Sequence, residues 1–209
     1  MSAVKPVLLC DLDGVLVDST NAIARVYRDW ARRHGLDEEL VVATAQGRPS
    51  HKVVRVCAPS LDVDAERSAI DAAHTADQDG VVAIAGAAEL LAGTPPGRLA
   101  VVTSCSTALA RARFAAAGLP QPRVCITEEQ VTRGKPDPEG YLRAAAALGA
   151  DPKTCVVLED APAGVAAGLA AGMHVIAVLT SHGAAELGTA HAFVDDLAGV
   201  PAIAAGLVA

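Results

Sequence analysis

Two aspartates that stand two residues apart are the first residues of this sequence that could do chemistry. Asp11 and Asp13 follow the apolar run 7–10, and Gly14 comes directly after them. Residues i and i+2 of a strand share a face, so both carboxylates would face one pocket. There they repel each other unless a cation is bound or one of them holds a proton. The pair therefore indicates a divalent metal, acid–base chemistry or both, whereas the simpler interpretation is an acidic turn after a strand.

Three further polar groups follow apolar runs or occupy a loop: Thr103 with Ser104, Glu159 with Asp160, and Lys135 in a Gly-Lys-Pro sequence. Each has a simpler explanation when taken alone. Hydroxyl side chains can cap a helix, a loop lysine can be solvated, and an acidic pair can end one strand and cap the next helix. Together they supply acidic ligands, a hydroxyl and an ammonium, which fits a phosphoryl group and its Mg²⁺.

Apolar segments of strand length alternate with helical patterns in most of the chain. Strands are predicted at 7–10, 99–102, 124–126, 155–158 and 174–178, and helices at 88–92, 107–117, 139–148 and 162–171. This alternation predicts an α/β fold, a doubly wound parallel sheet of Rossmann-like type with helices on both faces. Ligands bind such sheets at the carboxyl ends of the strands, which is where all three groups and the aspartate pair would lie.

The segment 16–80 keeps a helical pattern and contains no convincing strand. Ser19 is the predicted N-cap of its first helix, and Gly35 is predicted to end that helix. We therefore predict a small α-helical cap at 16–80, inserted into a Rossmann-like catalytic core formed by 1–15 and 81–209.

The composition of the chain indicates which partners and which cellular compartment to expect. The 209 residues carry a net charge of −7 without a basic block, so nucleic acid is not an expected partner. The apolar opening, about 4–10, is too short for a signal peptide or a membrane span. We expect a cytoplasmic monomer, with a homodimer as the alternative. Five scattered cysteines without a CxxC pair are expected to be reduced: Cys10, Cys57, Cys105, Cys125 and Cys155.

Four ordered motifs, at 11–19, 101–104, 134–136 and 157–164, resemble those of the haloacid-dehalogenase superfamily of phosphohydrolases with a helical cap. Longer stretches at 30–36, 110–113, 118–120 and 133–136 are similar to bacterial sugar-phosphate phosphatases. Two positions depart from that pattern. Cys105 stands where these relatives usually have glycine, and Cys10 where an aromatic residue often precedes the nucleophile. Cys105 is expected to constrain the phosphate loop, and neither change removes a catalytic group.

The resemblance implies a role for each polar group. Asp11 would be the nucleophile that forms an aspartyl-phosphate, and Asp13 the general acid and then the general base. Mg²⁺ would be held by Asp11, the backbone carbonyl of Asp13 and Asp160, with Glu159 as a further ligand or a neighbouring partner. Lys135 would balance the charge of nucleophile and phosphate. Thr103 (hydroxyl) and Ser104 (N–H) would hold phosphate oxygens, in a register that stays open by one residue.

The cap is expected to select the substrate through its most polar loop, residues 46–52. Arg48, His51 and Lys52 would contact a sugar or polyol there, although a solvated basic loop is a strong alternative. The histidines at 34, 74, 182 and 191 show no ligand spacing and receive no role.

These residues favour a Mg²⁺-dependent phosphatase acting on small sugar or polyol phosphates. A β-phosphoglucomutase-like sugar phosphomutase is the alternative, because it would use the same aspartates and cap. A non-enzymatic phospho-receiver is less favoured, since it would lack the helical insertion and the second aspartate. Dehalogenase chemistry is disfavoured because a departing halide does not need the acid that Asp13 supplies.

Overall fold

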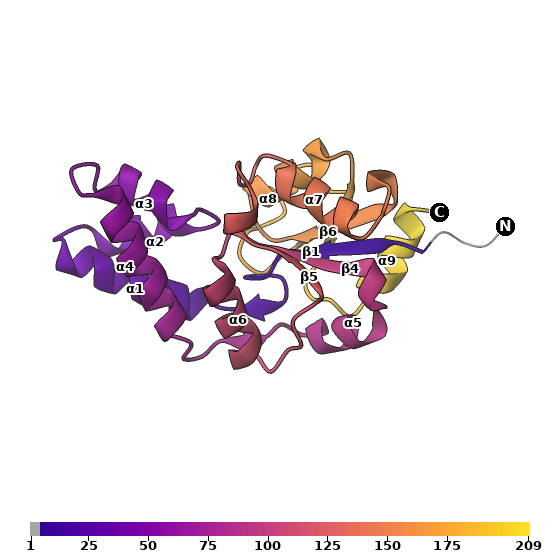
Figure 1. The fold of residues 1–209 in the computed structure, drawn as a ribbon, viewed down its shortest axis with the longest axis horizontal. Coiled ribbons are helices and arrows are strands. Elements are labelled where there is room, and N and C mark those ends of the chain that lie inside the picture. The colour runs from indigo at the N-terminus through magenta and orange to yellow at the C-terminus, as the bar shows by residue number, and fades with distance from the viewer. Residues whose placement is uncertain (1–4) are drawn as a thin grey trace.

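A six-stranded parallel sheet forms the centre of the computed structural model, which describes residues 5–209 (Figure 1). Its order is β5-β4-β1-β6-β7-β8. The strands are β1 (Val7–Cys10), β4 (Leu99–Val102), β5 (Val124–Ile126), β6 (Cys155–Glu159), β7 (His174–Val178) and β8 (Ala192–Val194). The predicted doubly wound α/β fold is confirmed. Residues 1–4, which begin the predicted core and include the start of the apolar opening, lie outside the described residues.

Alternate residues of each strand contact opposite layers of helices. Leu8 packs into one buried cluster together with side chains of α6 and α9, whereas Leu9 packs into a second cluster with side chains of α7 and α8. Continuous apolar strands are what a sheet buried on both faces requires. The helices of the core are α5 (Ala87–Gly93), α6 (Thr107–Ala116), α7 (Glu139–Ala147), α8 (Pro162–Ala170) and α9 (Val200–Leu207), with 3₁₀ turns η1 (Pro96–Arg98), η2 (Glu128–Gln130) and η3 (Pro152–Thr154).

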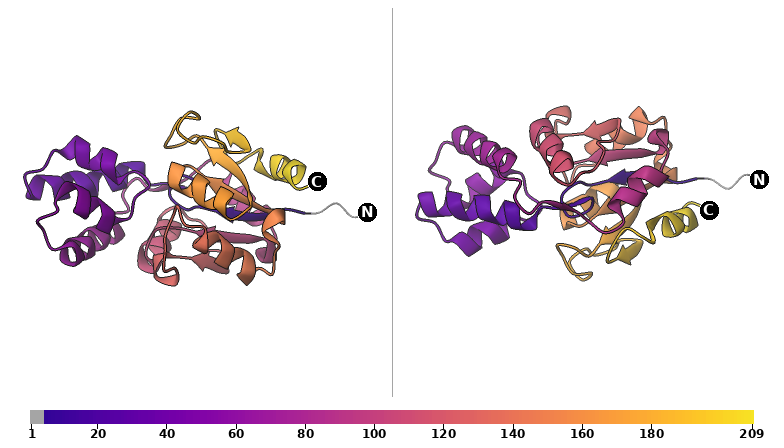
Figure 2. Two further views of the ribbon diagram at one scale, coloured as in Figure 1. Left: turned by 90° about the horizontal axis from the view of Figure 1, so that it is seen from above. Right: turned by 90° about the horizontal axis from the view of Figure 1, so that it is seen from below.

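Four helices form a separate body beside the sheet (Figure 2). They are α1 (Thr20–Arg33), α2 (Glu38–Ala45), α3 (Ser50–Cys57) and α4 (Val63–Ala76). This cap has its own apolar core around the fully buried Trp30, whose indole N–H donates to Glu66 Oε2 at 2.7 Å. Gly35 ends α1 as predicted: its φ of +65° favours glycine, and it allows the Leu36 N–H to bond Ala31 O at 2.9 Å.

The two chain segments that join cap and core lie side by side. β2 (Val17–Asp18) and β3 (Val82–Ala83) pair in antiparallel register, with Val17 opposite Ala83. All four cap helices fall between these two short strands. We keep the division into a cap at 16–80 and a core at 1–15 and 81–209 as a proposal.

The sequence pattern did not predict three of the strands, one of the α-helices and the three 3₁₀ turns. β2, β3 and β8 are only two or three residues long, too short to show an alternation, and α9 contains no polar side chain, so it has no polar face. Ser19 occupies the N-cap position of α1, yet its side chain caps nothing there. Within residues 5–209, none of the helices combines the length and the apolar character that crossing a membrane would demand.

Candidate active site

The carboxyl ends of β1 and β6 place three carboxylates together. The two strands are neighbours at the point where the strand order reverses, and the Asp11 N–H donates to Leu158 O at 2.9 Å. Asp11, Glu159 and Asp160 each offer an oxygen within 4.8 Å of the others. The predicted convergence of Asp11 with Glu159 and Asp160 is therefore present in the fold.

This acidic group holds three carboxylates against one ammonium, that of Lys135. Burial, and to a smaller extent the charge of Glu159, raise the pKa of Asp11 to about 7, although Lys135 acts in the opposite direction. Burial also raises the pKa of Asp160 well above its ordinary value, with Glu159 and Asp11 adding to the shift. Clustered carboxylates resist ionisation unless a cation is present. The donor set of hard oxygens fits Mg²⁺.

Lys135 lies between two of these carboxylates. Its ammonium forms ion pairs with Asp11 Oδ1 at 2.9 Å and with Glu159 Oε1 at 2.5 Å. The geometry of the pair with Asp11 is not that of a hydrogen bond. It also donates to Val102 O at 3.1 Å. Burial works to lower the pKa of Lys135, but the charges of Asp11 and Glu159 raise it overall. The side chain is therefore a fixed cation beside Asp11.

Glu159 is fully buried and already surrounded by donors. Oε1 accepts from Tyr141 OH at 2.7 Å and also forms the ion pair with Lys135, and Oε2 accepts from the next two backbone N–H groups at 3.2 and 3.3 Å. A Cβ at Gly164 would lie 1.8 Å from the Glu159 carboxyl carbon, so only glycine leaves room for this side chain. Of the two roles expected for Glu159, these contacts favour the neighbouring partner over the metal ligand.

Asp160 keeps one oxygen open. Ser181 donates to Oδ2 at 2.5 Å, while Oδ1 accepts no hydrogen bond from any residue that the structure describes. Gly14 packs against this carboxylate with a φ of +82°, and a Cβ there would lie 1.9 Å from Asp160 Oδ2. Asp160 and Asp11 are thus the side chains best placed to hold a cation.

The loop after β4 carries Thr103 and Ser104 to the same edge. The Thr103 N–H donates to Ile126 O at 2.9 Å, and its hydroxyl accepts from the Cys105 N–H at 3.1 Å, which leaves the hydroxyl proton free to donate. Ser106, rather than either of these residues, caps α6 by accepting from the Leu109 N–H at 3.2 Å. The simpler explanation of Thr103 and Ser104 as helix caps is therefore wrong. Likewise, α8 starts after Ala161 without a side-chain cap from the acidic pair.

Three donors hold the carboxylate of Asp13. Ser19 donates to Oδ1 at 2.5 Å, Arg113 Nε donates to Oδ1 at 3.0 Å, and Cys105 Sγ donates to Oδ2 at 2.8 Å. Burial and the charge of Asp13 raise the pKa of the Cys105 thiol well above its ordinary value, so it remains a donor. The Ser19 hydroxyl, which was predicted to cap α1, instead donates to Asp13. Cys105 contacts the same aspartate.

A cleft between cap and core encloses about 280 Å³, close to the lower end of the roughly 300–1,000 Å³ of small-molecule pockets. Arg48 lines it from the cap side, whereas His51 lines an adjoining cavity and the exposed Lys52 lines neither. The core side includes Asp11, Asp13, Thr103, Ser104 and Lys135, and the cap side includes Tyr27, Ser50, Asp71 and His74.

The sequence of this chain is similar to that of a known protein family. The haloacid dehalogenase-like hydrolase family matches residues 8–178. The chain belongs to this family. The match includes the cap as well as all the strands that carry the acidic group, and it confirms the resemblance on which the site residues were assigned.

Two relatives of this haloacid dehalogenase-like hydrolase are named as phosphatases. Hexitol phosphatase A of Escherichia coli is 47% identical over 178 residues, with 81% of each chain covered. Validoxylamine A 7'-phosphate phosphatase of Streptomyces hygroscopicus is 37% identical over 200 residues, covering 91% of this chain and 93% of the relative. A Deinococcus radiodurans family hydrolase, solved with bound phosphate and sodium, superposes with a TM-score of 0.72 at 32% identity, covering 99% and 98% of the chains. The predicted phosphoric monoester hydrolase agrees with these relatives.

Several residues of this haloacid dehalogenase-like site were not predicted from the sequence to take part in it. They are Ser19 and Arg113 at Asp13, Tyr141 at Glu159, and Ser181 and His182 at Asp160, where His182 Nδ1 lies 3.0 Å from the backbone carbonyl. Arg113 did leave a signal, because it falls on the apolar stripe of its helix together with Ala110 and Phe114. An arginine on a buried stripe needs an anionic partner.

Proposed function

We propose that the protein is a Mg²⁺-dependent phosphatase that hydrolyses small phosphomonoesters, sugar or polyol phosphates, through an aspartyl-phosphate on Asp11. The meeting of Asp11 with Lys135 and Asp160 at the ends of β1 and β6 carries this proposal. A carboxylate nucleophile, a cation 2.9 Å from it and an acidic site for a metal are what phosphoryl transfer requires. Asp13 and the helical cap disfavour a phospho-receiver.

In the first half-reaction an Asp11 oxygen bonds to phosphorus while the bond from phosphorus to the alcohol oxygen breaks. The leaving oxygen keeps the electron pair and takes a proton from Asp13. Thr103 and Ser104 hold phosphate oxygens, and Lys135 offsets their charge. A bound Mg²⁺, held by Asp11, Asp160 and the Asp13 carbonyl, would supply further charge neutralisation on the phosphate.

In the second half-reaction the Asp13 carboxylate removes a proton from water. The water oxygen bonds to phosphorus as the bond to the Asp11 oxygen breaks, which releases orthophosphate and restores the Asp11 carboxylate. The same Asp13 side chain therefore has to be aligned in both steps.

The substrate class rests on the relatives and on the cleft. Two relatives are named as a hexitol phosphatase and a validoxylamine A 7'-phosphate phosphatase, and a small cleft bordered by Arg48 suits a small organic phosphate. All five cysteines are free thiols, which supports a reducing compartment such as the cytoplasm. We retain the proposals that the protein is a monomer and that it binds neither nucleic acid nor membrane.

A screen for phosphate release tests this function. Sugar, polyol and glycolytic phosphates are offered with and without Mg²⁺, and the organic product is identified. Release of orthophosphate supports a phosphatase, whereas an isomeric sugar phosphate without orthophosphate supports the phosphomutase. Asp11→Asn should abolish turnover because an amide cannot act as the nucleophile, while Asp195→Asn, at an exposed aspartate, should keep it. Turnover by Asp11→Asn at the wild-type rate would disprove the covalent mechanism.

A further inference from the structure

Arg113 is an arginine of α6 with no exposed surface. It lies on the buried stripe of the helix beside Ala110 and Phe114. Removing a guanidinium from water costs several kcal/mol unless an anion and hydrogen bonds compensate. A residue of this kind in an otherwise apolar layer needs a reason beyond packing, and its contacts supply one.

The anion that Arg113 contacts is Asp13, one hundred residues earlier in the chain. The guanidinium Nε donates to Asp13 Oδ1 at 3.0 Å. Ser19 and Cys105 also donate to this carboxylate, but Arg113 is the charged member of the three. Because the guanidinium fork is planar and rigid, its position limits the directions in which the Asp13 carboxylate can point.

The other side of the guanidinium reaches the segment that leaves the cap. Arg113 Nη1 donates to Gln78 Oε1 at 2.9 Å. Gln78 Nε2 in turn donates to His74 O, in the last turn of α4, at 2.6 Å. Arg25 of α1 fixes the same segment by two hydrogen bonds of 2.8 Å to Asp77. A continuous chain of hydrogen bonds therefore runs from α4 through Gln78 and Arg113 to Asp13.

We propose that Arg113 is a positioning residue for Asp13, and that it aligns this carboxylate only while the cap is seated, through Gln78 and the end of α4. The inference rests on the proposed function, in which Asp13 gives a proton to the leaving oxygen and later takes one from water. Arg113 is buried and acts through Asp13 without touching substrate. Cap closure over a substrate is thus linked to the orientation of the acid that the reaction needs.

The test compares two substrates that differ in their need for a proton. An alkyl substrate, a hexitol phosphate, requires protonation of its leaving oxygen, whereas p-nitrophenyl phosphate does not. Arg113→Met should lower kcat/KM for the hexitol phosphate by about 10²-fold, the lower end of general-acid contributions, and for p-nitrophenyl phosphate by less than about tenfold. A burst of p-nitrophenolate should appear, because hydrolysis of the aspartyl-phosphate still lacks its aligned base.

Three further variants separate positioning from a structural role. Arg111→Met removes an exposed arginine of the same helix and should change neither substrate. Gln78→Leu keeps the Arg113–Asp13 pair but breaks the link to α4, so it should show the same selective loss to a smaller extent. Arg113→Lys restores a cation without the fork and should recover part of the hexitol phosphate activity. If Arg113→Met does not fold, Gln78→Leu and Arg113→Lys carry the same comparison.

The outcomes distinguish the two proposals. A wild-type protein that releases phosphate from no substrate overturns the proposed function, and this inference with it. An active wild type in which the Arg113 and Gln78 variants lower kcat/KM equally for both substrates, or not at all, overturns the inference alone.

Discussion

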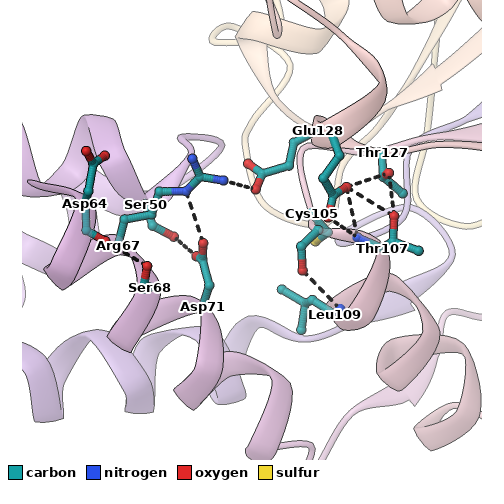
Figure 3. A network of polar contacts seen from close by, with 12 residues as sticks. Ser50, Asp64, Arg67, Ser68, Asp71, Cys105, Thr107, Leu109, Thr127 and Glu128 are labelled. Carbon is teal, nitrogen blue, oxygen red and sulfur yellow. Dashed lines mark hydrogen bonds and ion pairs between the residues drawn. The ribbon is translucent and has the colours of Figure 1, made fainter.

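Arg67 of α4 and Glu128 of η2 form an ion pair that spans the cleft between cap and core (Figure 3). Arg67 Nε also lies 3.3 Å from Asp71 Oδ2, and Asp71 accepts from Ser50 at 2.5 Å. On the core side, the Glu128 N–H donates to Cys105 O at 3.1 Å. The pair therefore joins the wall of the cap to the loop expected to bind phosphate.

Arg67→Met should loosen the seated cap. The two side chains are 38% and 19% exposed, so solvent screening limits the contribution of the pair to about 1 kcal/mol or less. We expect KM for a polyol phosphate to rise by up to about fivefold, and small-angle scattering to show a larger radius of gyration. Arg55→Met, at an exposed arginine of α3, is the control. Unchanged KM and radius in Arg67→Met would show that the pair does not hold the cap.

Mg²⁺ should stabilise the fold through the acidic group. At ten times its dissociation constant a bound ion adds about 1.4 kcal/mol to the free energy of unfolding, which urea denaturation with and without Mg²⁺ measures. Asp160→Asn should lose most of this gain because Asp160 Oδ1 is the open oxygen, whereas Asp195→Asn should keep it. EDTA should also abolish turnover. An equal gain in Asp160→Asn and the wild type would place the ion elsewhere.

Arg48→Ala should affect recognition of the substrate rather than the chemistry. Arg48 lines the cleft from the cap, so KM for a hexitol phosphate should rise while kcat/KM for p-nitrophenyl phosphate stays nearly unchanged. Arg55→Ala serves as the control for removal of a cap arginine. Equal damage to both substrates would assign Arg48 to catalysis or to folding.

His74 should make the fold less stable in acid. Burial, and then the charge of Arg113, lower its pKa from 6.5 to about 4, although Asp13, Asp71 and Asp77 act in the opposite direction. The unfolded chain therefore binds a proton that the folded chain refuses, so stability falls as pH drops below 6.5. Near pH 5 the loss is about 2 kcal/mol.

Urea denaturation of wild type and His74→Gln at about pH 7 and about pH 5 measures this loss. The pH dependence of the wild type should exceed that of the variant by the stated amount. Parallel curves for the two proteins would contradict the assignment to His74.

The sequence was sufficient to predict that the three carboxylates of the acidic group lie together. Asp11, Glu159 and Asp160 each follow an apolar run of strand length, and neighbouring parallel strands present their carboxyl ends at one edge. Gly14 and Gly164 appeared in the same motifs, and the structure gives the reason: any side chain there would overlap Asp160 or Glu159. Local pattern and global topology agreed at these positions.

The contacts around Asp13 could not be predicted from the sequence. Whether Arg113 reaches Asp13 depends on how α6 is turned against a loop one hundred residues away, and no spacing rule encodes that. The prediction for Ser19 was wrong for a related reason. A hydroxyl before a helix usually caps that helix, but the Ser19 hydroxyl donates to Asp13 instead. The positions of Arg48, His51 and Lys52 relative to the cleft likewise depend on how the cap is seated.

The pairing of Val17 with Ala83 gives the cap a modular character. Because the insertion leaves and rejoins the core at adjacent points, a different helical body could replace it through one small junction without re-threading the sheet. Groups that act on phosphorus would stay with the sheet, and a new body would have to reproduce the contact of Gln78 with Arg113. Substrate range could then change by exchange of a whole segment, while the reaction remained the same.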